Sequence, residues 1–375
     1  MTDQEYMLRA IQLAQKGEGW TNPNPMVGAV IVKDGRIIGE GYHKKYGELH
    51  AERNAIASLT ESAEGAVIYV TLEPCCHHGK TPPCTEAIIE QKIRKVVIGS
   101  RDPNPKVAGK GVQMLREAGV TVVEDFMREE CDQLNPVFFH YITTKTPYVV
   151  MKYAMTLDGK IATKTGASKW ITGESARKEV QHMRHQYMGI MAGIGTVLAD
   201  DPMLNVRVEG WKSPVRIVCD SKLRIPPGSQ IVKSAEKYRT IVAYAEQKNA
   251  KEKIKILHTM GVETIYCPDE KNQIDLKKLM ADLGNRGIDS ILLEGGGTLN
   301  DSALRAGIVK EVQAFVAPKL FGGVAGKTPV EGIGVEFPSE AVELKYTDIC
   351  QIGEDIRIRC QVCEKKQEES CLQES

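Results

Sequence analysis

The apolar positions of the first 144 residues follow helical and strand spacings in turn. Apolar side chains at Tyr6, Ile11 and Leu13 predict an amphipathic helix that ends near Gly17. The turn signal Lys-Asp-Gly-Arg at 33–36 separates two apolar runs and predicts a hairpin. Strands are expected at 26–32, 37–42, 66–72, 95–99 and 120–123, and later helices at 50–59, from 83 onward, at 109–118 and at 125–141. A hairpin followed by alternating helices and strands predicts an α/β sheet covered by helices.

A polar, β-branched stretch at 143–146, followed by Pro147, predicts a boundary between two domains. The alternation then starts again with a strand at 148–155, so the second part is also expected to be α/β. Further strands are expected at 189–192, 215–219, 240–244, 263–266, 290–293, 311–317, 342–347 and 355–360, and helices at 174–186 and 248–260. The predicted domains are therefore 1–144 and 148–363, and the polar tail 364–375 is expected to be disordered.

The length, net charge and apolar runs of the chain indicate how many domains, which partners and which compartment to expect. The chain has 375 residues, which exceeds the ~100–200 residues of one typical domain. Lys plus Arg and Asp plus Glu number 49 each, so the net charge is zero. Because proteins that bind nucleic acid usually carry a basic excess, we expect no such partner. No apolar run approaches the ~18–20 residues that span a bilayer, and the charged N-terminus lacks a signal-peptide core, so we expect a cytoplasmic protein without membrane contact.

Cysteine and histidine residues provide the first candidate site. Thiols stay reduced in the cytoplasm, so the ten cysteines are candidates for metal binding or catalysis rather than disulfides. His50 and Glu52 begin a predicted helix, and Cys75 and Cys84 lie where a strand leads into another helix. One imidazole and two thiolates suit a tetrahedral Zn²⁺ with an open fourth position for water. Zinc lowers the pKa of such a water to roughly 7, and Glu52 is expected to carry its proton to a leaving amine.

Other ligand sets remain open at this point. The known deaminase signature is H-x-E followed by P-C-x-x-C, whereas a longer segment separates Cys75 from Cys84 here. Cys76, His77 and His78 are therefore alternative ligands. A structural zinc site, or buried cysteines beside surface histidines, is the competing interpretation, and Cys76 alone is expected to be a packing residue. The combination of H-x-E with proline-flanked cysteines favours a catalytic zinc.

A glycine run provides the second candidate site. Residues 290–300 predict a strand, a loop at Gly295–Gly297 and a helix whose N-terminus attracts a phosphate. The G-x-G-x-x-G fingerprint and the P-loop Lys-Ser/Thr are both missing from this run, which argues against a dehydrogenase of the Rossmann type and against a nucleotide triphosphatase. The alternative is a tight strand-to-helix turn without a ligand.

These motifs together resemble a known family. The segment 22–28, H-A-E at 50–52 and P-C-x-H-x-G-x-T-P-P-C at 74–84 are similar to the bifunctional riboflavin-biosynthesis deaminase/reductases, and the resemblance covers almost the whole chain. It implies a cytidine-deaminase-like α/β/α sandwich followed by a dihydrofolate-reductase-like α/β domain. It also implies one catalytic Zn²⁺ on His50, Cys75 and Cys84, with Glu52 as proton shuttle. The usual serine after the first cysteine is Cys76 here. The resemblance implies deaminase substrate contacts from Asn24, His43, Lys80, Asp102 and Asn104.

The second half carries further family motifs at 152–162, 168–172, 193–202 and 204–207. The resemblance implies NADPH contacts from Ala154, Trp170, Thr196, Asp200, Ser221, Gly296, Gly297, Thr298, Leu299, Asn300, Asp301 and Ser302. It implies contacts with a sugar-phosphate substrate from Lys152, Ser168, Arg184, Leu204, Arg207 and Glu294. The guanidinium groups of Arg184 and Arg207 suit phosphate oxygens, although a lone arginine is more often a solvated surface charge.

By this resemblance, the chain deaminates 2,5-diamino-6-ribosylamino-4(3H)-pyrimidinone 5′-phosphate and then uses NADPH to reduce the ribosyl chain, giving 5-amino-6-ribitylamino-uracil 5′-phosphate. Its partner is then this small pyrimidine ribosyl phosphate, and a homo-oligomer is expected. A nucleic-acid-editing deaminase would instead predict a basic surface and the P-C-x-x-C spacing. A non-catalytic, metal-stabilised binding protein would predict a fourth protein ligand and no need for Glu52. A third possibility is that one half is degenerate.

Overall fold

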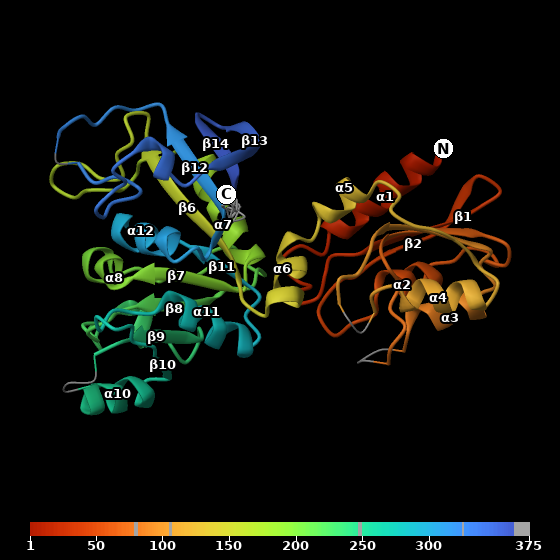
Figure 1. Cartoon of the computed structure of the whole chain (residues 1–375), viewed down its shortest axis with the longest axis horizontal. Helices are drawn as coiled ribbons and strands as arrows, with labels where there is room; N and C mark the ends of the chain where they lie inside the picture. The colour runs from red at the N-terminus through yellow and green to blue at the C-terminus, as the bar shows by residue number, and fades with distance from the viewer. Residues whose placement is uncertain (79–81, 105–106, 247–249, 325, 364–375) are drawn as a thin grey trace, which may run out of the picture.

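The computed structural model describes residues 1–78, 82–104, 107–246, 250–324 and 326–363. Two α/β units follow each other along the chain, each built around its own sheet (Figure 1). The predicted tail, 364–375, lies outside the described residues. None of the described helices is long and apolar enough to cross a membrane.

The first unit contains a five-stranded sheet. Its strands are β1 (Gly28–Lys33), β2 (Arg36–Tyr42), β3 (Val67–Leu72), β4 (Lys95–Ser100) and β5 (Thr121–Val123), and its helices are α1 (Asp3–Gln15), α2 (Ala51–Ala57), α3 (Cys84–Glu90), α4 (Lys110–Glu117), α5 (Arg128–Asp132) and α6 (Pro136–Thr144). The strand order is β2-β1-β3-β4-β5. β1 pairs antiparallel with β2 and β3, whereas β3, β4 and β5 run parallel. The predicted hairpin and helix–strand alternation are confirmed.

Helices cover both faces of this sheet. Tyr6 of α1 shares a buried cluster with Val30, whereas Ala55 of α2 and Leu115 of α4 share another with Ile31. Successive side chains of a strand point to opposite faces, so Val30 faces α1 and Ile31 faces α2. The expected α/β/α sandwich is therefore confirmed.

The single helix expected over 125–141 is wrong, because α5 ends at Asp132 and α6 begins only at Pro136. A proline disfavours the helical conformation in the residue before it, and Asn135 has φ −129° and ψ 40°. The Asn135 carboxamide accepts a hydrogen bond from the Met26 N–H and donates one to the Met26 carbonyl, both at 2.8 Å. The break between the helices thus fixes the chain just before β1.

Two glycines allow α2 to lie directly on β2. A Cβ atom at Gly41 would lie 2.2 Å from the Ala55 nitrogen, and one at Gly39 would lie 2.6 Å from the Ala55 carbonyl oxygen. Both separations are shorter than real contacts, so any larger residue would displace the helix. The position of α2 matters because the H-A-E motif lies at its start.

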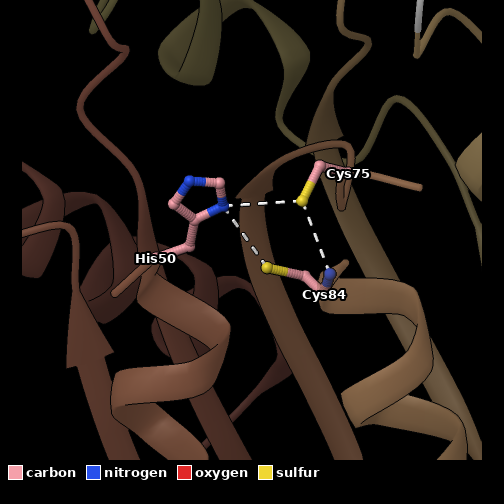
Figure 2. A group of neighbouring side chains, drawn as sticks. All are labelled: His50, Cys75 and Cys84. Atoms are coloured by element: carbon pink, nitrogen blue, oxygen red, sulfur yellow. Dashed lines mark hydrogen bonds between the residues drawn. The ribbon is translucent and has the colours of Figure 1, made fainter. Parts of the chain in front are cut away.

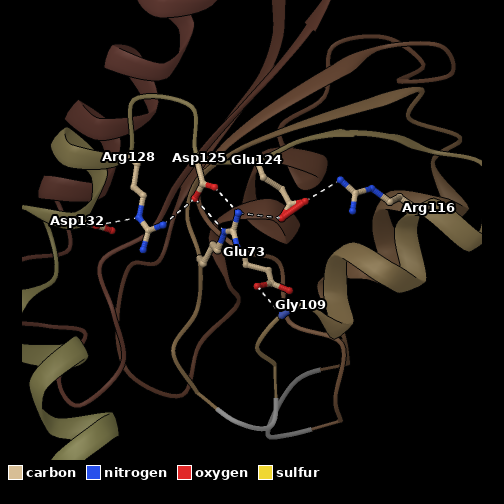
Figure 3. A network of polar contacts seen from close by, with 8 residues as sticks. Glu73, Gly109, Arg116, Glu124, Asp125, Arg128 and Asp132 are labelled. Carbon is tan, nitrogen blue, oxygen red and sulfur yellow. Dashed lines mark hydrogen bonds and ion pairs between the residues drawn. The ribbon is translucent and has the colours of Figure 1, made fainter.

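A polar network holds the loops that follow β3 and β4 (Figure 3). Glu73, directly after β3, accepts hydrogen bonds from the N–H groups of Gly109 (3.1 Å) and Val112 (3.3 Å), which satisfies donors at the start of α4. Arg101, directly after β4, donates to Asp125 (3.0 Å). These hydrogen bonds fix the direction in which the chain leaves β3 and β4. Cys75 and Asp102 follow these two strands at the same edge of the sheet.

The second unit contains a nine-stranded sheet. Its strands are β6 (Tyr148–Thr156), β7 (Gly189–Gly193), β8 (Val215–Cys219), β9 (Thr240–Tyr244), β10 (Val262–Tyr266), β11 (Ser290–Leu293), β12 (Val309–Ala317), β13 (Leu344–Ile352) and β14 (Asp355–Val362). Its helices are α7 (Glu174–Gln186), α8 (Ile194–Asp200), α9 (Gln230–Lys233), α10 (Ala250–Thr259), α11 (Leu276–Asn285), α12 (Gly297–Arg305) and a 3₁₀ turn at Pro338–Glu340. The order is β10-β9-β8-β7-β11-β6-β12-β14-β13. Across the sheet in this order, all strands from β10 through β6 to β12 run parallel to one another. β14 pairs antiparallel with both β12 and β13.

Helices also cover both faces of the second sheet. Leu279 of α11 and Ala303 of α12 share a buried cluster with Ile291, whereas Met183 of α7 clusters with Leu292 on the other face. The predicted second α/β unit is confirmed. The helices at 194–200, 230–233 and 276–285 did not stand out from the apolar pattern of the sequence.

Candidate active sites

Three metal-binding side chains gather where α2 and α3 begin (Figure 2). His50 directly precedes α2, Cys75 follows β3, and Cys84 is the first residue of α3. Nδ1 of His50 lies 3.5 Å from the sulfur of each cysteine, and all three ligand atoms lie within 4.8 Å of one another. A tetrahedral zinc with Zn–S of about 2.3 Å and Zn–N of about 2.0 Å separates nitrogen and sulfur ligands by roughly 3.6 Å. The three side chains therefore fit a zinc ion.

The competing ligands lie outside this group. Among the described residues, His50, Cys75 and Cys84 form the only group of three or more potential ligands close enough to share an ion. His78 Nε2 lies 3.3 Å from Glu86 Oε1 at the surface, and His77 lines the neighbouring cavity. Three protein ligands leave one tetrahedral position for water, which is the arrangement of a catalytic zinc.

Glu52 lies beside this cluster, in the first turn of α2. Its side chain is buried and lines the same cavity as His50 and Cys75. Burial raises the pKa of Glu52, and the nearby Cys75 sulfur raises it further. Hydrogen bonds from Cys84 and then His50 lower the pKa of Cys75, whereas the hydrogen bond to Cys75 and burial raise the pKa of Cys84. A buried carboxyl group of raised pKa suits the acceptance and return of a proton near neutral pH.

The cavity over the cluster has a volume of about 280 Å³. Four of the predicted substrate residues line it, namely Asn24, His43, Asp102 and Asn104. His43 Nδ1 lies 3.1 Å from the Leu49 carbonyl oxygen and must donate to it, so Nε2 accepts from the Asn24 carboxamide at 3.3 Å. Burial lowers the pKa of His43, which favours this neutral tautomer. The predicted Lys80 lies outside the described residues.

Beside the predicted residue Asp102, this cavity is lined by side chains that the sequence did not single out. Burial raises the pKa of Asp102 to about 6, and a carboxyl group of that kind is a candidate hydrogen-bond partner for a heterocycle. Tyr46, Glu48 and Phe138 also line the cavity. Phe138 belongs to α6, in a stretch for which the sequence predicted a helix and no site residue. Glu73 is the exception, since it directly precedes the Pro-Cys motif.

A second cleft, of about 750 Å³, lies at the carboxyl ends of β6, β7, β8 and β11. This edge is where open α/β sheets bind their ligands. The predicted NADPH residues that line it are Ala154, Trp170, Thr196, Asp200, Ser221, Gly296, Gly297, Thr298, Leu299 and Ser302. The predicted substrate residues that line it are Lys152, Ser168, Arg184, Arg207 and Glu294.

Three predicted side chains do not line this cleft. Leu204 is buried in the hydrophobic core. The Asn300 carboxamide donates a hydrogen bond to the Pro329 carbonyl (2.8 Å). Asp301 forms an ion pair with Arg305 (2.9 Å). Leu204 thus packs in the core, Asn300 joins α12 to the segment at Pro329, and Asp301 pairs within its own helix. The sequence alone does not distinguish such contacts from ligand contacts.

The glycine run shapes the middle of the cleft. Gly296 faces open space, whereas a Cβ atom at Gly297 would lie 2.4 Å from Glu331 Cγ. Gly296 therefore leaves room for a ligand, and Gly297 is needed so that the loop carrying Glu331 can pack on α12. The N–H groups at the start of α12 point at this space and suit an anionic phosphate group.

Charged side chains gather at one end of the cleft. Arg184 and Glu294 form a largely buried ion pair (2.7 Å). Burial raises the pKa of Glu294, but the positive charges of Arg184 and then Lys152 have the larger opposite effect. The pKa of Glu294 is therefore lowered to about 2. Burial lowers the pKa of Lys152, which Glu294 partly offsets. The sequence did not single out Arg177, which lines the cleft and stacks on Trp170 at 4.7 Å from the ring centroid.

Comparison with known proteins agrees with both sites. Residues 1–100 match the model of the cytidine and deoxycytidylate deaminase zinc-binding region, and residues 147–358 match the RibD C-terminal domain. The "Riboflavin biosynthesis protein RibD" of Actinobacillus pleuropneumoniae is 58% identical over 356 residues, which cover 95% of this chain and 94% of that protein. The chain belongs to the RibD family. The Escherichia coli member is 41% identical, with 95% of this chain and 98% of that protein covered.

Solved structures of the family share the whole architecture. Acinetobacter baumannii RibD is 38% identical with a TM-score of 0.86, covering 96% of this chain and 99% of that chain. A Thermotoga maritima protein, described as a diaminohydroxyphosphoribosylaminopyrimidine deaminase/5-amino-6-(5-phosphoribosylamino)uracil reductase, is 39% identical with a TM-score of 0.85, covering 96% and 98%. The expected fold class, a cytidine-deaminase-like unit followed by a reductase unit, is confirmed.

Family membership decides between the functions left open by the sequence. The chain is a bifunctional deaminase and reductase of riboflavin biosynthesis, with zinc serving the first half and NADPH the second. An editing deaminase and a non-catalytic binding protein do not agree with a match that runs through both halves.

Proposed function

We propose that the first half deaminates 2,5-diamino-6-ribosylamino-4(3H)-pyrimidinone 5′-phosphate and that the second half reduces the ribosyl chain of its product to ribityl. The product of both steps is 5-amino-6-ribitylamino-uracil 5′-phosphate. The observation that carries this proposal is the pairing, in one chain, of a zinc-type ligand set beside a buried Glu52 with a separate cleft that combines a glycine loop and a charged end. The name of the similar Thermotoga maritima protein supports the same order of substrates.

In the deaminase half, His50, Cys75 and Cys84 would hold the zinc, which when bound would make a water molecule acidic enough to ionise near neutral pH. Glu52 accepts the proton of the attacking water and delivers it to the amino nitrogen. A carbon–oxygen bond from water replaces the carbon–nitrogen bond, and ammonia leaves. Asn24, His43, Asp102 and Asn104 orient the pyrimidine in the cavity. Lys80 is proposed to contact the substrate phosphate.

In the reductase half, bound NADPH supplies the hydride for C1 of the opened ribosyl chain. The start of α12 at Gly296–Gly297 would hold an anionic phosphate group of NADPH, and the other cleft residues predicted for NADPH would hold the rest of the cofactor. Arg207 binds the substrate phosphate, and Glu294 and Arg184 shape the pocket around the sugar. Opening of the ribose ring leaves C1 double-bonded to the amino nitrogen and turns the ring oxygen into the C4 hydroxyl, so that hydride addition to C1 and protonation of that nitrogen give the ribitylamino group. The Lys152 ammonium orients this opened chain in the cleft.

One incubation tests both steps. The purified protein is given the diaminopyrimidine ribosyl phosphate with and without NADPH, and the products are identified by mass. Without NADPH we expect the deaminated ribosyl compound and one equivalent of ammonia, and with NADPH the ribityl compound. Recovery of unchanged substrate in both incubations would overturn the proposal, and accumulation of the deaminated compound despite NADPH would overturn its second half.

We further propose that two copies of the chain associate through an uncovered face of the second sheet. The register of β13 and β14 puts Leu344, Tyr346, Ile349 and Ile356 on one face, and each exposes between 42% and 68% of its surface. An apolar face exposed in this way is typical of an interaction surface. These four residues carry no charge. When two copies are related by a two-fold axis, their apolar side chains can therefore pack against each other without charge repulsion, which favours a second copy as the partner.

We propose the cytoplasm as the compartment in which the enzyme works. Cys75 and Cys84 can bind zinc only as reduced thiols, and both are free in the structure. Reduced thiols persist in the cytoplasm, which supports this assignment.

A further inference from the structure

We propose that the reductase half positions the substrate loop of the deaminase, and that Asp289 is the positioning residue through which it acts. The inference rests on the proposed function, since it takes Asn24 as a wall of the deaminase substrate cavity. The loop in question is the segment 18–26, here called the bridging segment. It connects α1 to β1 in the first unit, yet several of its side chains bind the second unit.

The first part of the bridging segment lies on α7 of the reductase half. Glu18 Oε2 lies 3.2 Å from His182 Nε2, and the Trp20 ring meets the His185 ring edge-on with centroids 4.8 Å apart. A Cβ atom at Gly19 would lie 2.5 Å from the His185 ring. The chain passes so close to α7 here that only glycine fits between them, and its positive φ of 74° also favours glycine.

Asp289 then holds the middle of the bridging segment. The Asn22 carboxamide donates to Asp289 Oδ2 at 2.9 Å, and the neighbouring Ser290 hydroxyl donates to Oδ1 at 2.5 Å. Asp289 is only 1% exposed and directly precedes β11, so a rigid strand fixes its position. A buried acceptor of this kind needs its donors, which gives the Asn22 side chain one strongly preferred place.

The end of the bridging segment lines the deaminase cavity. The Asn24 N–H donates to the Thr21 carbonyl at 2.8 Å, which closes a tight turn around Asn22. The Asn24 side chain then donates to His43 in the cavity wall. Asn24 also lines a second cavity of about 210 Å³ that Asp289 lines as well, so the two residues border one space between the halves.

In this arrangement only Pro23 separates Asn22, which contacts Asp289, from the substrate-orienting Asn24. If the contact is lost, Asn22 no longer has a fixed partner and the turn that presents Asn24 loosens. Misplacing an orienting group weakens substrate binding and alignment without touching the metal ligands or Glu52. The second half would thus contribute to deamination although its own cleft lies at the opposite, carboxyl end of β11.

The test compares D289A, D289N and Y141F. D289A removes the acceptor for Asn22, whereas D289N keeps an oxygen for it and should rescue the effect. Y141F is the matched control, because it removes another hydrogen bond between the halves, from the Tyr141 hydroxyl to the Gly284 carbonyl (2.9 Å), without touching the bridging segment. N22A removes the Asn22–Asp289 bond from the other side and keeps the test valid if D289A fails to fold.

We expect D289A and N22A to raise the KM for deamination by roughly tenfold, with zinc content and the rate of reduction of the deaminated intermediate unchanged. D289N and Y141F should stay within about twofold of the unmodified protein. The inference is overturned if N22A leaves the deamination KM unchanged, or if D289A and Y141F affect both activities equally. Failure of the unmodified protein to deaminate would instead overturn the proposed function itself.

Discussion

Arg184 and Glu294 meet in a two-point ion pair, with Nε 2.7 Å from Oε1 and Nη2 2.9 Å from Oε2. The pair joins α7 to the end of β11, and its side chains are only 11% and 14% exposed. The third nitrogen, Nη1, donates to the Asn205 carbonyl at 3.1 Å. Each guanidinium nitrogen of Arg184 thus has a protein partner, so this arginine mainly holds Glu294 in the cleft, and Arg207 is the better candidate for the substrate phosphate.

The first prediction concerns the variant E294Q. The amide cannot balance the buried Arg184 charge, and breaking a buried pair in this way costs about 3 kcal/mol of unfolding free energy. Urea denaturation measures that loss, and we expect reduction to fall while deamination persists. E174Q is the matched control, because it breaks an exposed pair with Lys178 on the same helix, worth roughly 0.3–0.5 kcal/mol. Equal stabilities of E294Q and E174Q would contradict the prediction.

The second prediction concerns the pH dependence of the same pair. The pKa of Glu294 is about 2 in the folded protein against an ordinary value of 4.5. A lowered pKa gives stability that is fully present above the ordinary value and is lost as the pH falls toward the folded value. The difference in unfolding free energy between the unmodified protein and E294Q should therefore be constant from pH 5 to 8 and shrink between about pH 4.5 and 2. A difference that is as large at pH 3 as at pH 7 would disprove this assignment.

The third prediction concerns the metal ligands. Serine is a poor zinc ligand, so C75S and C84S should bind less than one zinc per chain and lose deamination. C76S is the control, because Cys76 lies next to Cys75 but outside the ligand group. We expect C76S to keep one zinc per chain, as measured by a colorimetric chelator after unfolding. Reduction should persist in all three variants, and zinc loss in C76S alone would require a different ligand set.

The fourth prediction separates metal binding from proton transfer. In E52Q the three ligands are intact, so zinc content should stay at one per chain. The amide cannot accept a proton, so kcat for ammonia release should fall roughly 100-fold or more. The coupled ammonia assay measures this, with NADPH oxidation on the deaminated intermediate as the internal control. Deamination at the unmodified rate would exclude Glu52 as the proton carrier.

The extent to which the sequence predicts the structure differs between the two sites. His50, Glu52, Cys75 and Cys84 are chemically distinctive and lie at predicted element ends, so their meeting point followed from the pattern. Substrate and cofactor positions came from family resemblance, and some of them make contacts within the protein, since Asn300 donates to the Pro329 carbonyl and Leu204 packs in the core. Glycine, asparagine and leucine serve both purposes, and only packing distinguishes them.

Contacts between the two halves were not predictable at all. Asn22 belongs to a turn-forming Asn-Pro pair, and Asp289 is one acidic residue before a strand, so neither has a pattern that indicates a partner. The helix over 125–141 was wrong because Pro136 starts a new helix, and the residue before it, Asn135, leaves the helical conformation. Local signals therefore predicted elements and ligands, whereas long-range docking depends on the assembled fold.

The last prediction concerns association of two copies through the β13–β14 face. A lysine at position 349 would set two charges against each other across the two-fold axis and would leave them poorly hydrated. Light scattering should therefore give twice the 41.4 kDa chain mass for the unmodified protein and a single chain mass for I349K. I256K is the matched control, because Ile256 is similarly exposed (41%) but lies on α10. I256K should remain dimeric, and a monomeric unmodified protein at micromolar concentration would contradict the proposed interface. Because neither cleft is lined by Ile349, both activities should survive in I349K if each chain completes its own sites.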